Sequence, residues 1–306
     1  MKAKLFTVLL ATLVAGPMAL ANPLWTDPEK AAEENPDFLI QGEYVAEGKA
    51  AQVVAKGKGK FLISRYSGGL PGAGWDGGEI RKSMGDAETV SRQLEGYKRI
   101  EREVATLGAK PPEGATVLFD GSSDEEWGKK TMKDGLLMAG TTTKRKFGDF
   151  KLHLEFRLPF KPETPLSHQD RGNSGIYIFG RYEVQVIDSF GLDYDLSTWE
   201  GKNLSDSKQW CGSFYKFKTP DVPMCLPPLR WQSYDIDFTA PRFEDGKKVA
   251  NARVTVIHNG VKIHDDLELP KGTGMGGKKP EIPKGSLLLQ GHGNPVQYRN
   301  IWIVEG

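Results

Sequence analysis

The sequence predicts a mainly β protein: a jelly-roll, concanavalin A-like β-sandwich, preceded by a small β-rich region and one connector helix. From residue 116 onward, short apolar and β-branched runs are separated by turn residues. The chain contains 36 glycines and 19 prolines, as a fold with many turns requires. Asn259-Gly260 lies between two such runs and is a strong signal for a β-hairpin. Many short strands over this length favour a sandwich.

The first 21 residues have the pattern of a secretory signal peptide. Lys2 and Lys4 precede an apolar stretch over residues 5–15, and Ala19-Leu20-Ala21 forms a small-x-small cleavage site. The apolar stretch is too short to span a bilayer. We therefore expect export to the periplasm or the extracellular space, with cleavage near Ala21.

Three further parts follow the leader. Residues 22–84 form a small β-rich region, in which strands are expected around 38–40, 42–45, 51–55 and 61–66. Residues 85–110 contain the connector helix, because apolar side chains recur there at spacings of three and four and give one apolar stripe. Gly108 is a natural helix end. Residues 111–306 form the sandwich.

Charge and cysteine content narrow the choice of partners. The chain has 41 basic and 40 acidic residues, so it lacks the excess positive charge typical of proteins that bind nucleic acid or anionic membranes. No other segment is apolar and long enough to cross a membrane. Cys211 and Cys225 are its two cysteines, and in an exported chain an even number favours a disulfide. The alternative is two buried free thiols.

The segment from Asn173 to Ser189 is the most informative part of the chain. A polar turn at Asn173 leads into an apolar run, and residues 182–186 then alternate strictly between apolar and polar. Alternation with period two predicts a strand, with Glu183 and Gln185 on one face. A carboxylate beside an amide on one face of a sheet can bind a polar ligand such as a sugar.

This segment also resembles the central motif of a known family. NSGIYI followed by YEVQVID is similar to the motif of the DUF1080, or 3-keto-disaccharide hydrolase, family. Other landmarks occur in the expected order: residues 118–121, Trp127, and residues 134–136, 147–150, 154–156, 288–293 and 298–303. The resemblance covers about residues 116–305 and does not extend before Pro111. It implies a concanavalin-like sandwich, a 3-keto-glycoside substrate and a separate sugar 3-oxidoreductase that produces this substrate.

Candidate catalytic residues are Glu183, Asp188 and His292. Glu183 or Asp188 would act as a base, and His292, His168 or Arg299 would stabilise an anion. A divalent cation held by carboxylate and imidazole could do the same. Candidate substrate-binding residues are Asn173, Gln185, Tyr215, Gln290 and Arg299.

Two mechanisms are open if the protein is an enzyme. Two carboxylates could cleave an unmodified glycoside. Alternatively, a base could remove the acidic C2 hydrogen of a 3-keto-glycoside, after which the C1 leaving group departs and water adds. The rival to both is a non-catalytic carbohydrate-binding module of the same shape. Convergence of Glu183, Asp188 and His292 in one pocket would favour catalysis.

Overall fold

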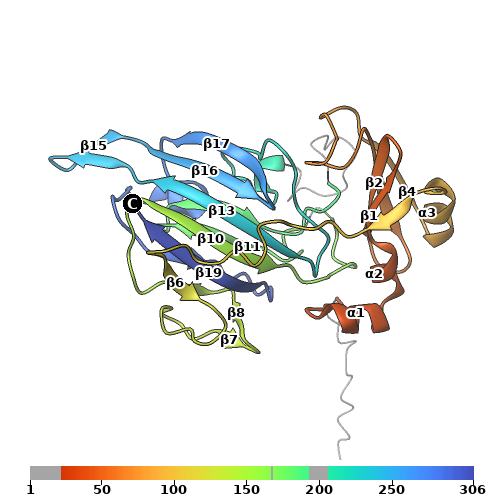
Figure 1. The fold of residues 1–306 in the computed structure, drawn as a ribbon, viewed down its shortest axis with the longest axis horizontal. Helices are drawn as coiled ribbons and strands as arrows, with labels where there is room; N and C mark the ends of the chain where they lie inside the picture. Colours follow the sequence, from red (N-terminus) through yellow and green to blue (C-terminus); the bar gives the residue numbers. More distant parts are fainter. Residues whose placement is uncertain (1–21, 167, 193–205) are drawn as a thin grey trace, which may run out of the picture.

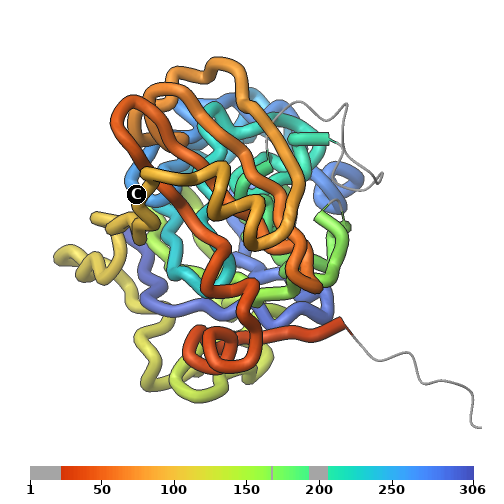
Figure 2. Tube along the Cα trace, turned by 90° about the vertical axis from the view of Figure 1, so that its right-hand side faces the viewer, coloured from red at the N-terminus to blue at the C-terminus, as the bar shows by residue number. Residues whose placement is uncertain are grey.

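The computed structural model describes residues 22–166, 168–192 and 206–306, and the predicted signal peptide lies outside them. The described residues form two units, an N-terminal sheet and a larger sandwich (Figure 1). In Figure 2 the N-terminal unit, coloured red to orange, faces the viewer and lies across one end of the sandwich. No helix in the described part of the chain is long and apolar enough to cross a membrane.

The N-terminal unit is a five-stranded antiparallel sheet with strand order β4-β3-β2-β1-β5. Two short helices, α1 (Pro28–Glu34) and α2 (Pro36–Ile40), precede it. The strand expected at 38–40 is therefore wrong, because Asn35 caps α2 and Pro36 stands at its first turn. The strands are β1 (Gly42–Ala46), β2 (Lys49–Ala55), β3 (Phe61–Ser67), β4 (Arg81–Gly85) and β5 (Lys98–Ile100).

The connector helix is much shorter than the sequence pattern predicts. Helix α3 covers only Ala87–Gln93, and Gly96 then adopts a positive φ of 79°. The next residues form β5, which pairs with the free edge of β1. The predicted extension of the helix is wrong because the backbone groups at the free edge of β1 pair with these residues as a strand. A continuing helix would leave that edge of β1 without hydrogen-bond partners. Val90 and Leu94 still pack into the core of the N-terminal unit, so part of the apolar stripe has the expected role.

The second unit is the predicted β-sandwich. Its larger sheet has eight strands in the order β17-β16-β13-β10-β19-β8-β7, with β6 also paired to β19. The smaller sheet has the order β12-β11-β18-β9, and β14 and β15 form a separate hairpin. The bounds are β6 (Thr116–Phe119), β7 (Met132–Lys133), β8 (Leu136–Met138), β9 (Thr141–Thr142), β10 (Phe150–Arg157), β11 (Ser174–Ile178), β12 (Tyr182–Val186), β13 (Trp231–Thr239), β14 (Arg242–Glu244), β15 (Lys247–Ala250), β16 (Ala252–His258), β17 (Val261–Leu269), β18 (Leu287–Leu289) and β19 (Gln297–Glu305), with 3₁₀ helices η1 (Ser207–Gln209) and η2 (Gly274–Lys278).

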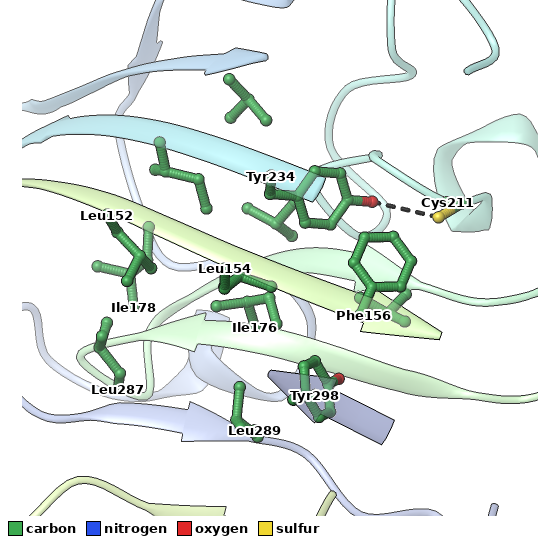
Figure 3. Packing of buried hydrophobic residues seen from close by; sticks show 14 of the residues in the cluster. Leu152, Leu154, Phe156, Ile176, Ile178, Cys211, Tyr234, Leu287, Leu289 and Tyr298 are labelled. Carbon is green, nitrogen blue, oxygen red and sulfur yellow. Dashed lines mark hydrogen bonds between the residues drawn. The ribbon is translucent and has the colours of Figure 1, made fainter. Parts of the chain in front are cut away.

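The core of the sandwich lies between the two sheets. Leu152, Leu154 and Phe156 of β10 belong to the same buried cluster as Ile176 of β11 and Leu289 of β18 (Figure 3). Because side chains alternate along a strand, the residues between the core positions of β11 and β12 point to the outer face of the smaller sheet. That outer face carries Glu183 and is where the candidate site is found.

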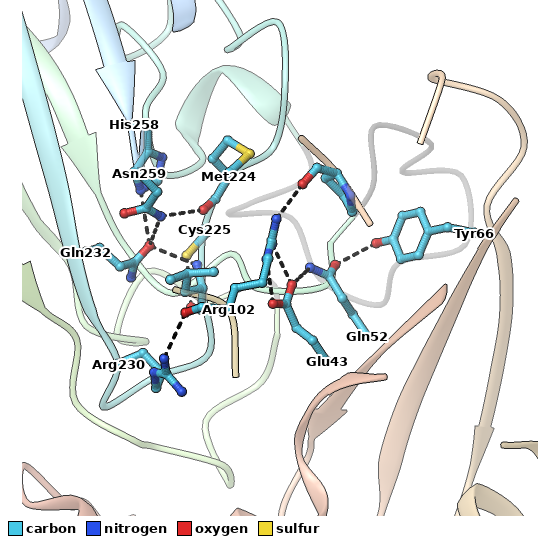
Figure 4. Close-up of polar contacts among 12 residues, drawn as sticks. Glu43, Gln52, Tyr66, Arg102, Met224, Cys225, Arg230, Gln232, His258 and Asn259 are labelled. Carbon is cyan, nitrogen blue, oxygen red and sulfur yellow. Dashed lines mark hydrogen bonds and ion pairs between the residues drawn. The ribbon is translucent and has the colours of Figure 1, made fainter. Parts of the chain in front are cut away.

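A polar interface joins the two units. The guanidinium of Arg102 donates to both carboxylate oxygens of Glu43, at 2.6 and 2.7 Å, and to the carbonyl of Pro71 (Figure 4). Arg230 of the sandwich donates to the Arg102 carbonyl at 3.0 Å. Ser64 Oγ donates to the carbonyl of Gly191, which follows β12 by a few residues, at 2.9 Å. The N-terminal sheet therefore packs beside the chain segment that leaves the candidate site.

Candidate functional site

The polar face of β12 holds a buried carboxylate at Glu183. Its side chain retains only 3% of its exposure, and it lies opposite Tyr177 in the register of β11 and β12. Tyr177 donates its hydroxyl hydrogen to Glu183 Oε2 at 2.6 Å. Burial raises the pKa of Glu183 to about 7, although the bond from Tyr177 acts in the opposite direction. A carboxylate with this pKa can accept and release a proton near neutral pH.

Gly175 makes room for the second oxygen of this carboxylate. A Cβ atom built on Gly175 would lie 2.7 Å from Glu183 Oε1 and 3.3 Å from Gln290 Oε1. Only a residue without a side chain therefore lets Oε1 lie over β11, beside Gln290. Within the described residues, Glu183 Oε1 has no hydrogen-bond partner. One carboxylate oxygen is thus held by a hydrogen bond, and the other is without one.

Three predicted binding residues carry amide groups on β12 and on the chain beside β11 and β18. Asn173, Gln185 and Gln290 are buried, with exposures of 5%, 1% and 7%. Asn173 Oδ1, Gln185 Nε2 and Gln290 Oε1 have no hydrogen-bond partner in the described structure. Gln185 is the register partner of Gly175, and the backbone amide of Gln290 donates to the Gly175 carbonyl at 2.8 Å. Because unpaired buried polar atoms are costly, this face is suited to a ligand that carries hydroxyl groups.

Tyr215 lies beside Glu183, and two glutamines bind its hydroxyl. Its hydroxyl accepts a hydrogen bond from Gln169 Nε2 at 2.7 Å and donates to Gln209 Oε1 at 3.0 Å. Its backbone amide donates to the Glu183 carbonyl at 3.1 Å. Sequence reasoning missed Tyr177, Gln169 and Gln209. The register of β11 and β12 places Tyr177 opposite Glu183. A hairpin register assigned to these two strands would therefore have identified Tyr177.

The structure does not bring Asp188 to this group. Asp188 Oδ2 accepts hydrogen bonds from Arg171 Nε at 3.0 Å and Nη2 at 2.6 Å, and both side chains are buried. The same arginine donates to the carbonyls of Lys161 and Thr164. Asp188 therefore anchors the loop before β11 to the end of β12. Its charge is compensated, so it is poorly suited to act as a base.

Arg299 lies on the other side of the sandwich from Glu183. It is on β19 of the larger sheet, where its Nε donates to Glu155 Oε2 at 2.6 Å and its guanidinium lies 4.0 Å from the ring centre of Trp231. The proposed binding role of Arg299 at the Glu183 site is therefore wrong. Because the two sheets pack face to face, residues on their outer faces cannot share a site across the core.

The two candidate histidines are exposed in loops. His292 follows β18, two residues beyond Gln290, and its carbonyl accepts a hydrogen bond from Asn294 at 3.5 Å. His168 Nδ1 accepts a hydrogen bond from the amide of Asp170 at 3.1 Å. Asn294 and Asp170 contact each other at 3.3 Å, so the two histidine-bearing loops are neighbours. Neither histidine contacts Glu183, and their catalytic roles remain predictions.

The two cysteines are free thiols in the structure, in contrast to the predicted disulfide. Cys211 Sγ lies 3.2 Å from the hydroxyl of Tyr234, and Cys225 Sγ donates to the carbonyl of Ile187 at 3.6 Å. Both side chains are buried, and burial raises the pKa of Cys225. The two thiols also make a hydrogen bond to each other, so they are neighbours within the sandwich core.

Among the described residues, no group of three or more His, Cys, Asp or Glu side chains could hold a metal ion. In the described structure, the hydrogen-bond partners of His168 and His292 do not include Glu183, so the carboxylate–imidazole pair considered for a cation is not formed at this site. Oxygen donors of the kind that Mg²⁺ and Ca²⁺ prefer are present in Glu183 Oε1 and Gln290 Oε1, which both border Gly175.

The fold and the site together define a class of protein: a β-sandwich with a buried carboxylate on the outer face of its smaller sheet. Residues 114–304 match the family model of the 3-keto-alpha-glucoside-1,2-lyase-like domain, and the chain belongs to this family. The match confirms the resemblance that the motifs indicate.

A solved structure agrees with this family membership. A protein from Parabacteroides distasonis ATCC 8503, assigned as a glycosyl hydrolase, is 32% identical with a TM-score of 0.51, over 64% of this chain and 85% of that chain. A second protein from the same organism, with the same assignment, is 21% identical with a TM-score of 0.46, over 63% of this chain and 94% of that chain. No curated protein matches the sequence.

Proposed function

We propose that this protein is an enzyme that cleaves 3-keto-glycosides, with Glu183 as the base. The observation that carries the proposal is the state of this carboxylate: buried, with a pKa of about 7, held through one oxygen and free at the other. Membership of the 3-keto-alpha-glucoside-1,2-lyase-like family supports a glycoside as the substrate.

The reaction starts at C2, where the neighbouring C3 ketone makes the hydrogen acidic. Glu183 Oε1 takes this proton, and the electron pair of the C–H bond forms an enediolate. The enediolate re-forms the ketone, a C1–C2 double bond forms, and the C1–O bond breaks. The departing oxygen takes up a proton. Water then adds its hydroxyl to C1 and a proton to C2, so that the net change is hydrolysis of the glycosidic bond.

The groups around Glu183 suit this route better than one with two carboxylates. The enediolate oxygen needs a hydrogen-bond donor in a site that excludes water, and Gln185 Nε2 is a buried donor without a partner. A two-carboxylate route needs a second free carboxyl group. Asp188, the candidate for that group, is paired with Arg171.

Two parts of the proposal concern the setting of the enzyme. Lys2, Lys4 and the Ala19-Leu20-Ala21 site support export, so the enzyme would act in the periplasm or outside the cell. Glycosides do not normally carry a C3 ketone, so a sugar 3-oxidoreductase would have to supply the substrate.

Sugar release from a 3-keto-glucoside by the purified protein tests the proposal. We expect turnover by the unaltered protein and a loss of about 10²–10⁴-fold in Glu183→Gln, the range typical of a missing general base. Glu281→Gln is the matched control, because Glu281 also accepts a hydrogen bond from a tyrosine, Tyr182, in the same sheet. An assay with a chelator shows whether a divalent cation takes part.

The outcomes separate the candidate functions. Turnover that survives in Glu183→Gln would overturn the role of Glu183. Absence of turnover in the unaltered protein, with saturable binding of a glycan, would leave the carbohydrate-binding module instead.

A further inference from the structure

A glycine-rich segment covers the Glu183–Tyr177 pair. Residues 272–278 read Gly-Thr-Gly-Met-Gly-Gly-Lys and include η2. Beneath this segment, Glu183 and Tyr177 keep exposures of 3% and 2%. A hexose ring could not bring a C–H bond to Glu183 while so little of the carboxylate is accessible.

Gly274 makes the closest contact of this cover. Its φ is +53°, and a Cβ atom built on it would lie 2.5 Å from Glu183 Oε2, 3.0 Å from the Tyr177 hydroxyl and 3.2 Å from Tyr215 Cδ1. The Gly274 backbone thus lies directly over the carboxylate and between the two tyrosines. This is the kind of polar and aromatic environment that a sugar ring occupies in a binding site.

Hydrogen bonds and backbone contacts, rather than apolar side chains, hold the segment in place. Thr273 Oγ1 accepts a hydrogen bond from the Glu183 amide at 2.8 Å, and the Thr273 amide donates to the Arg181 carbonyl at 2.8 Å. Gly276 packs on the backbone of Arg181, where a side chain would not fit. The backbone of Met275 makes a hydrogen bond to the Tyr177 hydroxyl, whereas its side chain is 67% exposed. A segment with four glycines and few buried apolar contacts opens at a low free-energy cost.

We propose that residues 272–278 form a lid that occupies the sugar position over Glu183 and moves away when the substrate binds. The inference rests on the proposed function, because only a catalytic Glu183 has to become accessible. It adds that the structure shows the closed form of this segment. The Thr273–Glu183 hydrogen bond is the latch of this lid.

A pair of glycine variants tests the lid without any substrate. In Gly274→Ala, the new methyl group would collide with the carboxylate and displace the lid. Gly180→Ala is the matched control, because Gly180 also has a positive φ, of 62°, but a Cβ there meets nothing within 4 Å. We expect about tenfold faster hydrogen exchange in residues 272–278 of Gly274→Ala than in Gly180→Ala. The carboxyl ¹³C titration of Glu183 should also move to lower pH, because solvent then reaches it.

A second pair tests the latch. Thr273→Val keeps the shape but removes the acceptor for the Glu183 amide, whereas Thr273→Ser keeps the acceptor. Exchange in residues 272–278 should be faster in the valine variant than in the serine variant. Equal exchange within both pairs, with an unchanged Glu183 titration, would overturn the lid.

Substrate displacement is measured with a 3-keto-glucoside added to the Glu183→Gln protein. We expect faster exchange in residues 272–278 when the sugar is bound, and slower or unchanged exchange would contradict displacement. An unaltered protein without turnover would refute the proposed function, whereas the exchange and titration experiments would still decide whether the segment opens.

Discussion

Tyr177 and Glu183 face each other across β11 and β12, and the tyrosine hydroxyl donates to Glu183 Oε2 at 2.6 Å. This bond favours the charged form of the carboxylate, whereas burial favours the neutral form. The balance gives Glu183 a pKa of about 7 and leaves Oε1 as the free oxygen. It also keeps the phenol protonated, because burial and the nearby carboxylate raise the pKa of Tyr177.

Replacement of Tyr177 by phenylalanine should therefore move the pH dependence of activity. A base must be deprotonated, so kcat/KM should rise with pH through about 7 in the unaltered protein. In Tyr177→Phe the charged form loses its hydrogen bond, and the rise should shift upward by about one pH unit. Tyr182→Phe removes a similar bond, to Glu281, and should leave the profile unchanged. A profile that is the same in Tyr177→Phe would show that the bond does not set this pKa.

A methyl group at Gly175 should disturb the reacting oxygen directly. The Cβ position lies 2.7 Å from Glu183 Oε1, so Gly175→Ala should turn the carboxylate away from its place beside Gln290. Since small displacements of a catalytic group are costly, we expect kcat to fall about 10–100-fold. Gly148→Ala, where the nearest atom is 3.4 Å away on the lysine side chain of Lys284, is the control for a tolerated substitution. Normal kcat in Gly175→Ala would argue against Oε1 as the base.

We expect Asp188 to contribute to the stability of the fold and not to catalysis. Asp188→Asn leaves the buried guanidinium of Arg171 without its counter-charge, and the loss of one partner in such a pair costs about 3–5 kcal/mol of unfolding free energy. Urea unfolding measures this loss. Full stability with abolished turnover would instead return Asp188 to the catalytic group.

A buried charge network behind the larger sheet should make stability depend on pH. Burial alone would lower the pKa of His153, but hydrogen bonds and charges from Asp235 and Glu155 outweigh it and raise the pKa to about 9. Burial would likewise raise the pKa of Glu155, but its partners His153, Asn300, Gly108 and Arg299 lower it to about 2. Gly108 and Ala109 of the segment between the two units are bound by this network, at 2.6 Å to Glu155 and 3.0 Å to Asn300.

The sign of each contribution follows from these shifts. The contribution of His153 is complete below about pH 6.5 and disappears as the pH rises through about 9. The contribution of Glu155 is complete above about pH 4.5 and disappears as the pH falls toward 2. Urea unfolding across this range should show both losses, and the alkaline loss should be absent in His153→Gln. A flat profile between pH 6.5 and 9 would contradict the raised pKa of His153.

Thiol counting distinguishes the structure from the sequence-based prediction at Cys211 and Cys225. Both thiols are free and buried. A thiol reagent should therefore react with neither in the folded protein and with both after unfolding in denaturant. If no thiol reacts in denaturant without a reducing agent, the pair is bonded as the sequence indicates.

The sequence by itself determined the sandwich and the central part of the site. Alternation over residues 182–186 placed Glu183 and Gln185 on one face, because the period of a strand is fixed by backbone geometry. The family motifs led to Tyr215 and Gln290, whose backbones bind Glu183 and Gly175, and to Asn173, which precedes β11; their binding roles stay predictions. Periodicity gave a wrong prediction after Gln93. The apolar spacing there predicted a helix, but residues 98–100 pair with the free edge of β1 and form β5.

Only the tertiary structure decided which residues meet. Asp188 and Arg299 have side chains suited to a sugar site, but Arg171 binds the first and Glu155 binds the second. Tyr177 and Gly274 were not among the predicted site residues, and they reach Glu183 through strand register and a distant loop. Periodicity fixes the face on which a side chain lies. Its partner, its burial and hence its pKa depend on contacts between segments far apart in the chain.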